Sequence, residues 1–388
     1  MASSSDAFAP PPPAAPRAAT AAAGVVLLLT LAAGLAGTAW AVATGQLDLL
    51  PAPVTREAFL DGRTTRGVAD ALGQAPPARI AADAERAAGW LLLRDLGPQV
   101  RQGCPGWLFL AEELMPHPDG ETHARRRAEV VARLHQALQH RGIHLLVAVV
   151  PDKSRIAHDR LCGLRRAAAF DGRVQRWMET LRAAGVPAVD LAPALAALQQ
   201  QGTDAFFRTD THWNEDGAQR AAEAVARAVR AQGWQPAPPQ SYEIVREPAA
   251  VRPGDLVRLA GIDRLPLRWQ PQAETARAVR FDAVGAGTGG TATEDDLFGD
   301  AGLPRTALLG TSFSRNAGFA GFLAHALRTP VANFGRDGGN FSGGAAAYFA
   351  GPAWRQTPPR LIIWEIPERT LQRPVQDEAQ QWEALATV

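Results

Sequence analysis

One long apolar run near the N-terminus dominates the hydropathy pattern of the chain. The segment AAAGVVLLLTLAAGLAGTAWAVATG contains no charged side chain, and about twenty apolar residues in a helix are enough to cross a membrane. Arg17 precedes the run and Asp48 follows it, which favours a cytoplasmic N-terminus. The pattern predicts a transmembrane helix over 21–44, preceded by a disordered cytoplasmic tail over 1–20 that is rich in Ser, Ala and Pro.

The same run could instead be a cleaved signal sequence, because AWA and AVA within 39–43 resemble signal-peptidase sites. The long tail before the run and the length of the run favour an uncleaved anchor. Under either interpretation, the bulk of the protein lies outside the cytoplasmic membrane. Residues 45–100 are punctuated by prolines and contain short helical stretches, so we expect a connector there.

Beyond the connector, short apolar runs alternate with segments of helical periodicity. The run IHLLVAVVP is almost continuously apolar and rich in β-branched residues, which is typical of a strand covered on both faces. Strands that alternate with helices predict an α/β fold with a mainly parallel sheet. Strands are expected at 106–110, 143–151, 186–191, 306–310, 331–334 and 360–367, and helices at 121–142, 171–184, up to about 201, 215–233, 315–328 and 343–356.

The stretch from 235 to 300 is less regular than the rest of this part of the chain. It predicts short strands near 242–247 and 278–283, and a loop rich in Gly and Thr at 285–293. The last residues, 376–388, are expected to form a C-terminal tail.

The charge balance and the cysteines exclude several classes of function. Forty Lys and Arg residues stand against 39 Asp and Glu, for a net charge of +1, so no nucleic-acid partner is expected. Lys153 is the only lysine. Cys104 and Cys162 have no metal-ligand spacing, and both a disulfide and two buried thiols remain open. We expect neither a metal site nor a cofactor.

The segment RTDTHWNED (208–216) carries the first candidate chemistry. Residues i and i+2 of an extended segment point to the same side, so Asp210 could fix the tautomer of His212 and stabilise its protonated form. Trp213 could exclude water beside them. The alternative is a polar loop in which Asp210 or Asn214 caps the next helix.

The segment LLGTSFS (308–314) carries the second candidate, a turn between a strand and a helix. Ser312 would be exposed at the turn, where backbone N–H groups of the helix start could face an oxyanion. Ser314 is better placed as a helix N-cap. By itself this pattern fits a simple capping loop equally well, but a serine turn and an acid–histidine pair in one α/β chain support each other.

Together, RTDTHWNEDGA, LLGTSFS and RLIIWEIPERTL resemble the SGNH-type acetyltransferases of the alginate O-acetylation system, the AlgJ and AlgX family. VRQGCPGWLFL and VVPDKSRI also fit that pattern, and the resemblance covers roughly residues 55–372. It implies a circularly permuted, three-layer SGNH-hydrolase-like domain over 101–375, in which the Asp-His motif precedes the serine. It also implies an enzyme anchored in the bacterial inner membrane with its catalytic domain in the periplasm.

The resemblance assigns roles to the three candidate residues. Ser312 would be the nucleophile, His212 the general base and acid, and Asp210 the orienting carboxylate. The usual SGNH serine block is GDS, whereas this chain has GTS, as the resembled family does. The substrate would be a hydroxyl of a secreted exopolysaccharide, and a membrane-bound O-acyltransferase would supply the acetyl group. The anchor, together with the absence of a following carbohydrate-binding module, favours an AlgJ-like member.

The remaining site assignments are less direct. The loop GGNFSGG could provide Gly339 and Asn340 as oxyanion donors, with Asn316 and Asn333 as competitors. Lys153, at a strand end, could bind an acidic sugar or pair with a carboxylate. Glu365 and Glu368 could be a glycosidase pair, but we interpret them as structural. Two other functions stay open: a carbohydrate acetylesterase with the same triad, and a non-catalytic polysaccharide-binding or assembly subunit.

Overall fold

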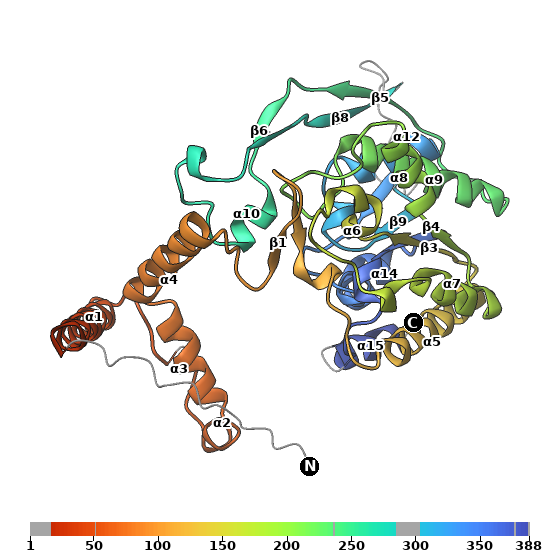
Figure 1. Cartoon of the computed structure of the whole chain (residues 1–388). Helices are drawn as coiled ribbons and strands as arrows, with labels where there is room; N and C mark the ends of the chain where they lie inside the picture. The colour runs from red at the N-terminus through yellow and green to blue at the C-terminus, as the bar shows by residue number, and fades with distance from the viewer. Residues whose placement is uncertain (1–16, 51, 236, 285–302, 376–377, 387–388) are drawn as a thin grey trace, which may run out of the picture. The chain divides into compact units, whose positions relative to one another are not determined.

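The computed structural model describes residues 17–50, 52–235, 237–284, 303–375 and 378–386, so the loop expected at 285–293 and most of the N-terminal tail lie outside the described residues. The chain divides into two compact units, the first ending at Leu93 and the second beginning at Arg94. Figure 1 shows the course of the chain.

The first unit is helical. Its first helix, α1 (Arg17–Ala43), contains the span Thr20–Ala43, the one span in the described residues that is long and apolar enough to cross a membrane. The expected connector folds into helices that end before residue 100: α2 (Arg56–Leu60), α3 (Arg63–Gly73), α4 (Pro76–Ala88) and the short π-helix η1 (Gly89–Leu93). Ala41, Leu47 and Ala75 form a small buried apolar cluster between the end of α1 and the start of α4.

The second unit is built on a five-stranded sheet in the order β10-β9-β11-β3-β4, and all four strand pairs are parallel. These strands confirm the expected α/β fold. Their bounds are β3 (His144–Val150), β4 (Ala188–Asp190), β9 (Thr306–Leu309), β10 (Val331–Asn333) and β11 (Leu361–Pro367). The central strand, β11, lies between β9 and β3, and therefore joins the two strand–helix series of the chain.

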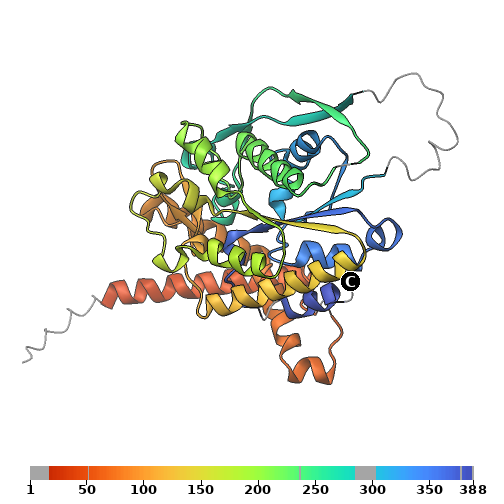
Figure 2. The same cartoon turned by 90° about the vertical axis from the view of Figure 1, so that its right-hand side faces the viewer.

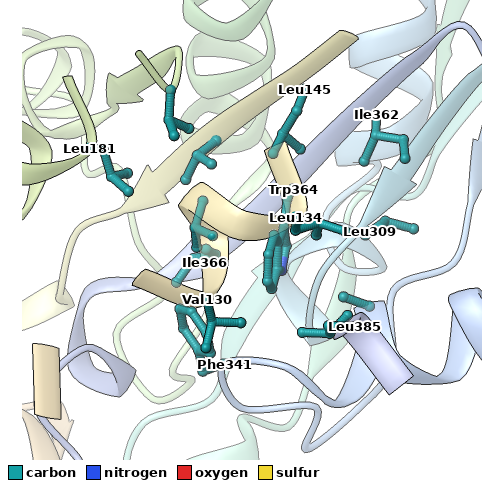
Figure 3. Close-up of a cluster of buried hydrophobic side chains, with 14 of the residues drawn as sticks. Val130, Leu134, Leu145, Leu181, Leu309, Phe341, Ile362, Trp364, Ile366 and Leu385 are labelled. Atoms are coloured by element: carbon teal, nitrogen blue, oxygen red, sulfur yellow. The ribbon is translucent and has the colours of Figure 1, made fainter. Parts of the chain in front are cut away.

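Helices cover both faces of the sheet and give the three layers that the resemblance implied (Figure 2). Along β3, Leu145, Val147 and Val149 face one apolar cluster, whereas Leu146, Ala148 and Val150 face another. Both sides of β3 are therefore apolar, which explains the continuous apolar run of this strand in the sequence. Figure 3 shows the first cluster, where Trp364 of β11 packs near Leu134 and Leu309.

The helices divide between the two faces of the sheet as follows. Those lining the first cluster are α5 (Gly120–His140), α7 (Arg173–Ala183), α13 (Gly343–Ala350), α14 (Pro352–Gln356) and α15 (Ala379–Ala386). Those lining the second are α8 (Ala192–Gln200), α9 (Glu215–Ala231) and α12 (Phe319–Leu327), with the short α6 (Lys153–Ile156). Single turns of 3₁₀-helix are η2 (Ala111–Glu113), η3 (His158–Arg160), η4 (Ala168–Phe170), η5 (Leu267–Trp269), η7 (Ser312–Ser314) and η8 (Glu368–Thr370).

Among the described residues, three antiparallel strand pairs lie outside the main sheet. The strand expected at 106–110 is β2 (Leu108–Leu110), which pairs with β1 (Val100–Gln102). The irregular stretch forms a ribbon of β5 (Ser241–Arg246) with β8 (Val279–Val284) and β6 (Ala250–Arg252) with β7 (Glu274–Ala276), and α10 (Asp255–Leu259) follows β6. Phe281 of the ribbon packs edge-on against Phe322 of α12, with 5.0 Å between the ring centroids.

Two helices differ from the sequence prediction for local reasons. The helix expected from residue 315 begins only at Phe319, because Ala317 and Gly318 both have positive φ angles, which interrupt a right-handed helix. The helix expected at 343–356 is two helices, α13 and α14. The break falls at Gly351-Pro352, where proline lacks the N–H that would continue the first helix.

Cys104 and Cys162 form a disulfide, which settles the alternative that the sequence left open. It joins the β1–β2 hairpin to the segment after α6, where the Cys104 N–H also donates to the Arg160 carbonyl at 2.8 Å.

We predict that replacing both cysteines by alanine lowers the free energy of unfolding by about 2–4 kcal/mol, because the crosslink constrains the unfolded chain. Urea unfolding of the full chain in detergent, with and without reductant, measures this difference. Reductant should leave the double variant unchanged, and an unchanged wild-type midpoint would contradict the prediction.

Candidate active site

The candidate nucleophile, Ser312, lies on a turn at the carboxyl end of β9. Thr311 immediately before it donates its N–H to Oε2 of Glu365 at 2.7 Å, and Ser314 donates its hydroxyl to the same oxygen at 3.0 Å. A Cβ on Gly310 would lie 2.4 Å from that oxygen, so only glycine fits there. Burial raises the pKa of Glu365, and the hydrogen bonds oppose that rise. Glu365 therefore has the structural role that we assigned to it.

Glu368, the other carboxylate considered for a glycosidase pair, lies in a buried ion-pair cluster. Its side chain forms ion pairs with Arg155, Arg166 and Arg173. The last two also pair with the buried Asp152. The charges of these arginines outweigh burial and lower the pKa of Glu368. Glu368 therefore has a structural role, as we interpreted it from the sequence.

The candidate acid–histidine pair lies on an irregular segment between α8 and α9. An isolated bridge between Phe206 and Trp213 closes this segment into a turn. Asn214 then caps α9, because its Oδ1 accepts the Gly217 N–H at 2.9 Å. Asn214 is therefore the N-cap of α9, one of the two residues considered for that role, and Asp210 is not.

The three candidate residues meet in one line of hydrogen bonds. Nε2 of His212 lies 2.7 Å from Oγ of Ser312, and Nδ1 lies 2.6 Å from Oδ1 of Asp210. Asp210 is 1% exposed and His212 is 6% exposed, while Ser312 is half-buried. A serine next to an imidazole whose far nitrogen is bonded to a carboxylate is the arrangement that activates a hydroxyl for attack on a carbonyl.

Asp210 has further partners that keep it ionised. Its Oδ1 also accepts the His212 N–H at 2.9 Å, and its Oδ2 accepts Nη2 of Arg252 at 3.0 Å and the Asp255 N–H at 3.2 Å. Burial by itself would raise the pKa of Asp210. The hydrogen bond and charge of His212, with the charge of Arg252, outweigh burial and hold that pKa far below its ordinary value.

Sequence reasoning missed Asp255 and Arg252. Asp255 accepts the Thr211 N–H at 2.7 Å and the Thr211 hydroxyl at 2.5 Å, and its Oδ2 lies 3.5 Å from Nδ1 of His212. Burial and the charge of Asp210 raise the pKa of Asp255. Asp210, His212 and Asp255 could also hold a metal ion, but a metal there would replace the hydrogen bond that orients His212. The one local signal for these residues is RPGDL, a common turn pattern.

Gly339 and Asn340, the expected oxyanion donors, have hydrogen-bond partners other than Ser312. The Gly339 N–H donates to the Arg336 carbonyl at 3.1 Å. Asn340 is exposed, and its Oδ1 accepts from Arg373 at 2.8 Å. The physical reason is that both groups already have partners away from Ser312, the Arg336 carbonyl and the Arg373 side chain.

The competing asparagines hold the serine turn. Nδ2 of Asn316 donates to the Ser312 carbonyl at 2.9 Å, and Nδ2 of Asn333 donates to the Ser314 carbonyl at 2.8 Å. Within the described residues no acceptor takes the Ser312 N–H, which makes it the better candidate for an oxyanion donor.

Lys153 differs from the role that we expected for it, and Trp213 lies in the interior next to the histidine segment. Lys153 is 1% exposed and donates to three backbone carbonyls, so its ammonium is not available to an acidic sugar. Trp213 is completely buried and packs against Phe313 and Phe319, with ring centroids 5.0 and 4.6 Å apart. It therefore supports the histidine segment from behind and does not line an open site.

The fold and site together define an SGNH hydrolase-like domain, and the comparisons with known proteins agree. The family described as "SGNH hydrolase-like domain, acetyltransferase AlgX" matches residues 100–368. The chain belongs to this family and is an acetyltransferase of SGNH type, as the resemblance implied.

Individual relatives support the same assignment. The probable alginate O-acetylase AlgJ of Pseudomonas aeruginosa is 31% identical over 313 residues, which cover 80% of this chain and 79% of that one. AlgJ of Pseudomonas putida is 33% identical over 304 residues, 76% of each chain. The solved O-acetyltransferase domain of P. putida AlgJ is 28% identical, with a TM-score of 0.63, and the match covers 75% of this chain and 99% of that one.

The ionisation of Asp210 leads to a prediction about stability and pH. Because the pKa of Asp210 is lowered on folding, its stabilising contribution is fully present above the pKa of the unfolded chain, about 3.9, and is lost as the pH falls below that value. Asp210→Asn should lower the free energy of unfolding by about 1–3 kcal/mol at pH 7, and by less at pH 3. Urea unfolding at both pH values measures this difference. Asp263→Asn, at an exposed position, is the matched control, and an equal loss for Asp210→Asn at both pH values would argue against the assignment.

Proposed function

We propose that this chain transfers acetyl groups to hydroxyls of a secreted polysaccharide through an acetyl ester on Ser312. The observation that carries the proposal is the line of hydrogen bonds from Ser312 through His212 to Asp210, at 2.7 and 2.6 Å, in a chain of an acetyltransferase family. The names of the AlgJ relatives specify alginate. They support an alginate-like or other exopolysaccharide as the acceptor.

The geometry supports a reaction in two steps. In the first, Oγ of Ser312 attacks the acetyl carbonyl while Nε2 of His212 takes the hydroxyl proton, and His212 then gives that proton to the leaving group. In the second, a sugar hydroxyl attacks the acetyl ester and His212 takes its proton. The proton returns to Oγ as the ester bond breaks. Asp210 stabilises the imidazolium in both steps, and the Ser312 N–H would face the oxyanion.

We further propose that the second unit works in the periplasm, anchored to the inner membrane by α1. Two observations support this location: the apolar span Thr20–Ala43 and the disulfide between Cys104 and Cys162, since disulfides persist in oxidising compartments. Acetyl-CoA is cytoplasmic, so a membrane-bound O-acyltransferase is the partner that we propose as acetyl supplier.

The triad proposal predicts the activity of single variants. Ser312→Ala and His212→Ala should lower acetyl transfer by about 10³-fold or more, because each removes a group that acts at the reacting atoms. Asp210→Ala should also abolish useful transfer. The assay is acetyl transfer from 4-nitrophenyl acetate to uronate oligosaccharides, followed by mass spectrometry of the oligosaccharides.

Ser314→Ala is the matched control for Ser312→Ala. Ser314 donates to Glu365 but has no contact with His212 among the described residues. The N–H and hydroxyl of Thr311 still donate to Glu365 in this variant, so the serine turn should stay in place and most of the activity should remain. Loss of transfer in Ser314→Ala alone would show that the nucleophile is misassigned. Free acetate without acetylated oligosaccharide would identify an acetylesterase. Unchanged transfer in all three triad variants would identify a non-catalytic subunit.

A further inference from the structure

Lys153, the only lysine of the chain, is buried next to the candidate active site, where it contacts the backbone of Asp210. It begins α6, just after the carboxyl end of β3. Its Nζ donates to the carbonyls of Leu108 at 2.6 Å, Arg208 at 2.8 Å and Asp210 at 3.0 Å. An ammonium group has three N–H donors, so three carbonyls use all of them.

The surroundings of Lys153 explain how a buried ammonium is tolerated. The rings of Trp107 and Phe109 lie with their centroids 5.2 and 5.1 Å from Nζ, close enough for cation–π attraction. Four carboxylates act on the ammonium from neighbouring elements: Glu113 of η2, Glu274 of β7, Asp210 of the histidine segment and Asp255 of α10. Burial outweighs their attraction and lowers the pKa of Lys153 to about 8.

By donating to these three carbonyls, Lys153 links the histidine segment to strand β2. Arg208 and Asp210 belong to the irregular segment that leads into His212, while Leu108 belongs to β2. The Leu108 N–H also donates to the Arg208 carbonyl at 2.9 Å. Buried carbonyls of an irregular segment need donors from elsewhere in the protein, and Lys153 supplies two of these carbonyls with one side chain.

We propose that Lys153 is a positioning residue whose ammonium fixes the backbone of the Asp210 segment and thereby sets the distance from His212 to Ser312. The inference rests on the proposed function, because it concerns the geometry of that triad. A neutral amine has only two N–H donors for the same three carbonyls. Deprotonation of Lys153 therefore frees one carbonyl, and a displaced histidine lowers the rate of the chemical step.

A single lysine allows this group to be observed directly. The full chain, labelled with ¹³Cε-lysine and studied in detergent, should give one lysine side-chain resonance. Arg227→Lys adds a lysine at an exposed position of α9, which serves as a reference within the same molecule. The Lys153 resonance should titrate near pH 8, well below the reference, and kcat for acetyl transfer should fall along the same midpoint with KM unchanged. Titration of both lysines together, or an activity profile without that midpoint, would overturn the inference.

Two variants test the same point by kinetics. Lys153→Gln and Lys153→Met should lower kcat at pH 7 about tenfold or more, with KM for the oligosaccharide unchanged and the alkaline decline abolished. If Lys153→Met does not fold, Lys153→Gln and the wild-type titration still decide. If Lys153→Gln keeps the wild-type kcat and pH profile while Ser312→Ala is inactive, the positioning role of Lys153 is refuted and the proposed function still stands. An active Ser312→Ala would instead refute the proposed function.

Discussion

One buried carboxylate, Glu365 in the central strand, determines where the serine turn lies. It is completely buried, and it accepts hydrogen bonds from Thr311 and Ser314 on either side of Ser312. A buried charge without such partners would cost several kcal/mol, so the turn and the carboxylate need each other. Gly310 leaves room for this contact because it lacks a side chain. Because the residues on either side of Ser312 are held by Glu365, the position of the half-buried Ser312 side chain is fixed as well.

The histidine segment needs separate support, because in the part of the chain that the structure describes it has no strand partner beyond one isolated bridge. Four charged side chains among the described residues hold it. Asp255 accepts from Thr211, and Arg252 donates to the far oxygen of Asp210. Glu274 accepts the N–H groups of Arg208 and Thr209, and Lys153 donates to the backbone carbonyls. Two independently fixed pieces of chain therefore meet at the bond from His212 to the serine. Reactivity of this kind depends on pre-set geometry more than on any single strong contact.

The sequence predicted the sheet well because both faces of β3 and β11 are covered, which leaves unbroken apolar runs. Spacing and strand ends are local signals, so the sequence also marked Asp210, His212 and Ser312 as candidates, and the structure places these side chains within hydrogen-bond distance of one another. The sequence could not predict Arg252 of β6 or Asp255 of α10, which contact Asp210 from more than forty residues away in the sequence. Whether a lone lysine is solvated or buried beneath a loop is likewise decided by tertiary packing, which no local pattern records.

In the proposed reaction, Ser312 carries the acetyl group between donor and polysaccharide. The most direct test is to expose the purified chain to an activated acetyl ester, quench it in acid, and map the acetylated residue by peptide mass spectrometry. We expect one acetyl group on Ser312, which disappears when an acceptor oligosaccharide is added and appears on that sugar. An acetyl group on another residue, or transfer to the sugar without any acetyl-serine, would contradict it.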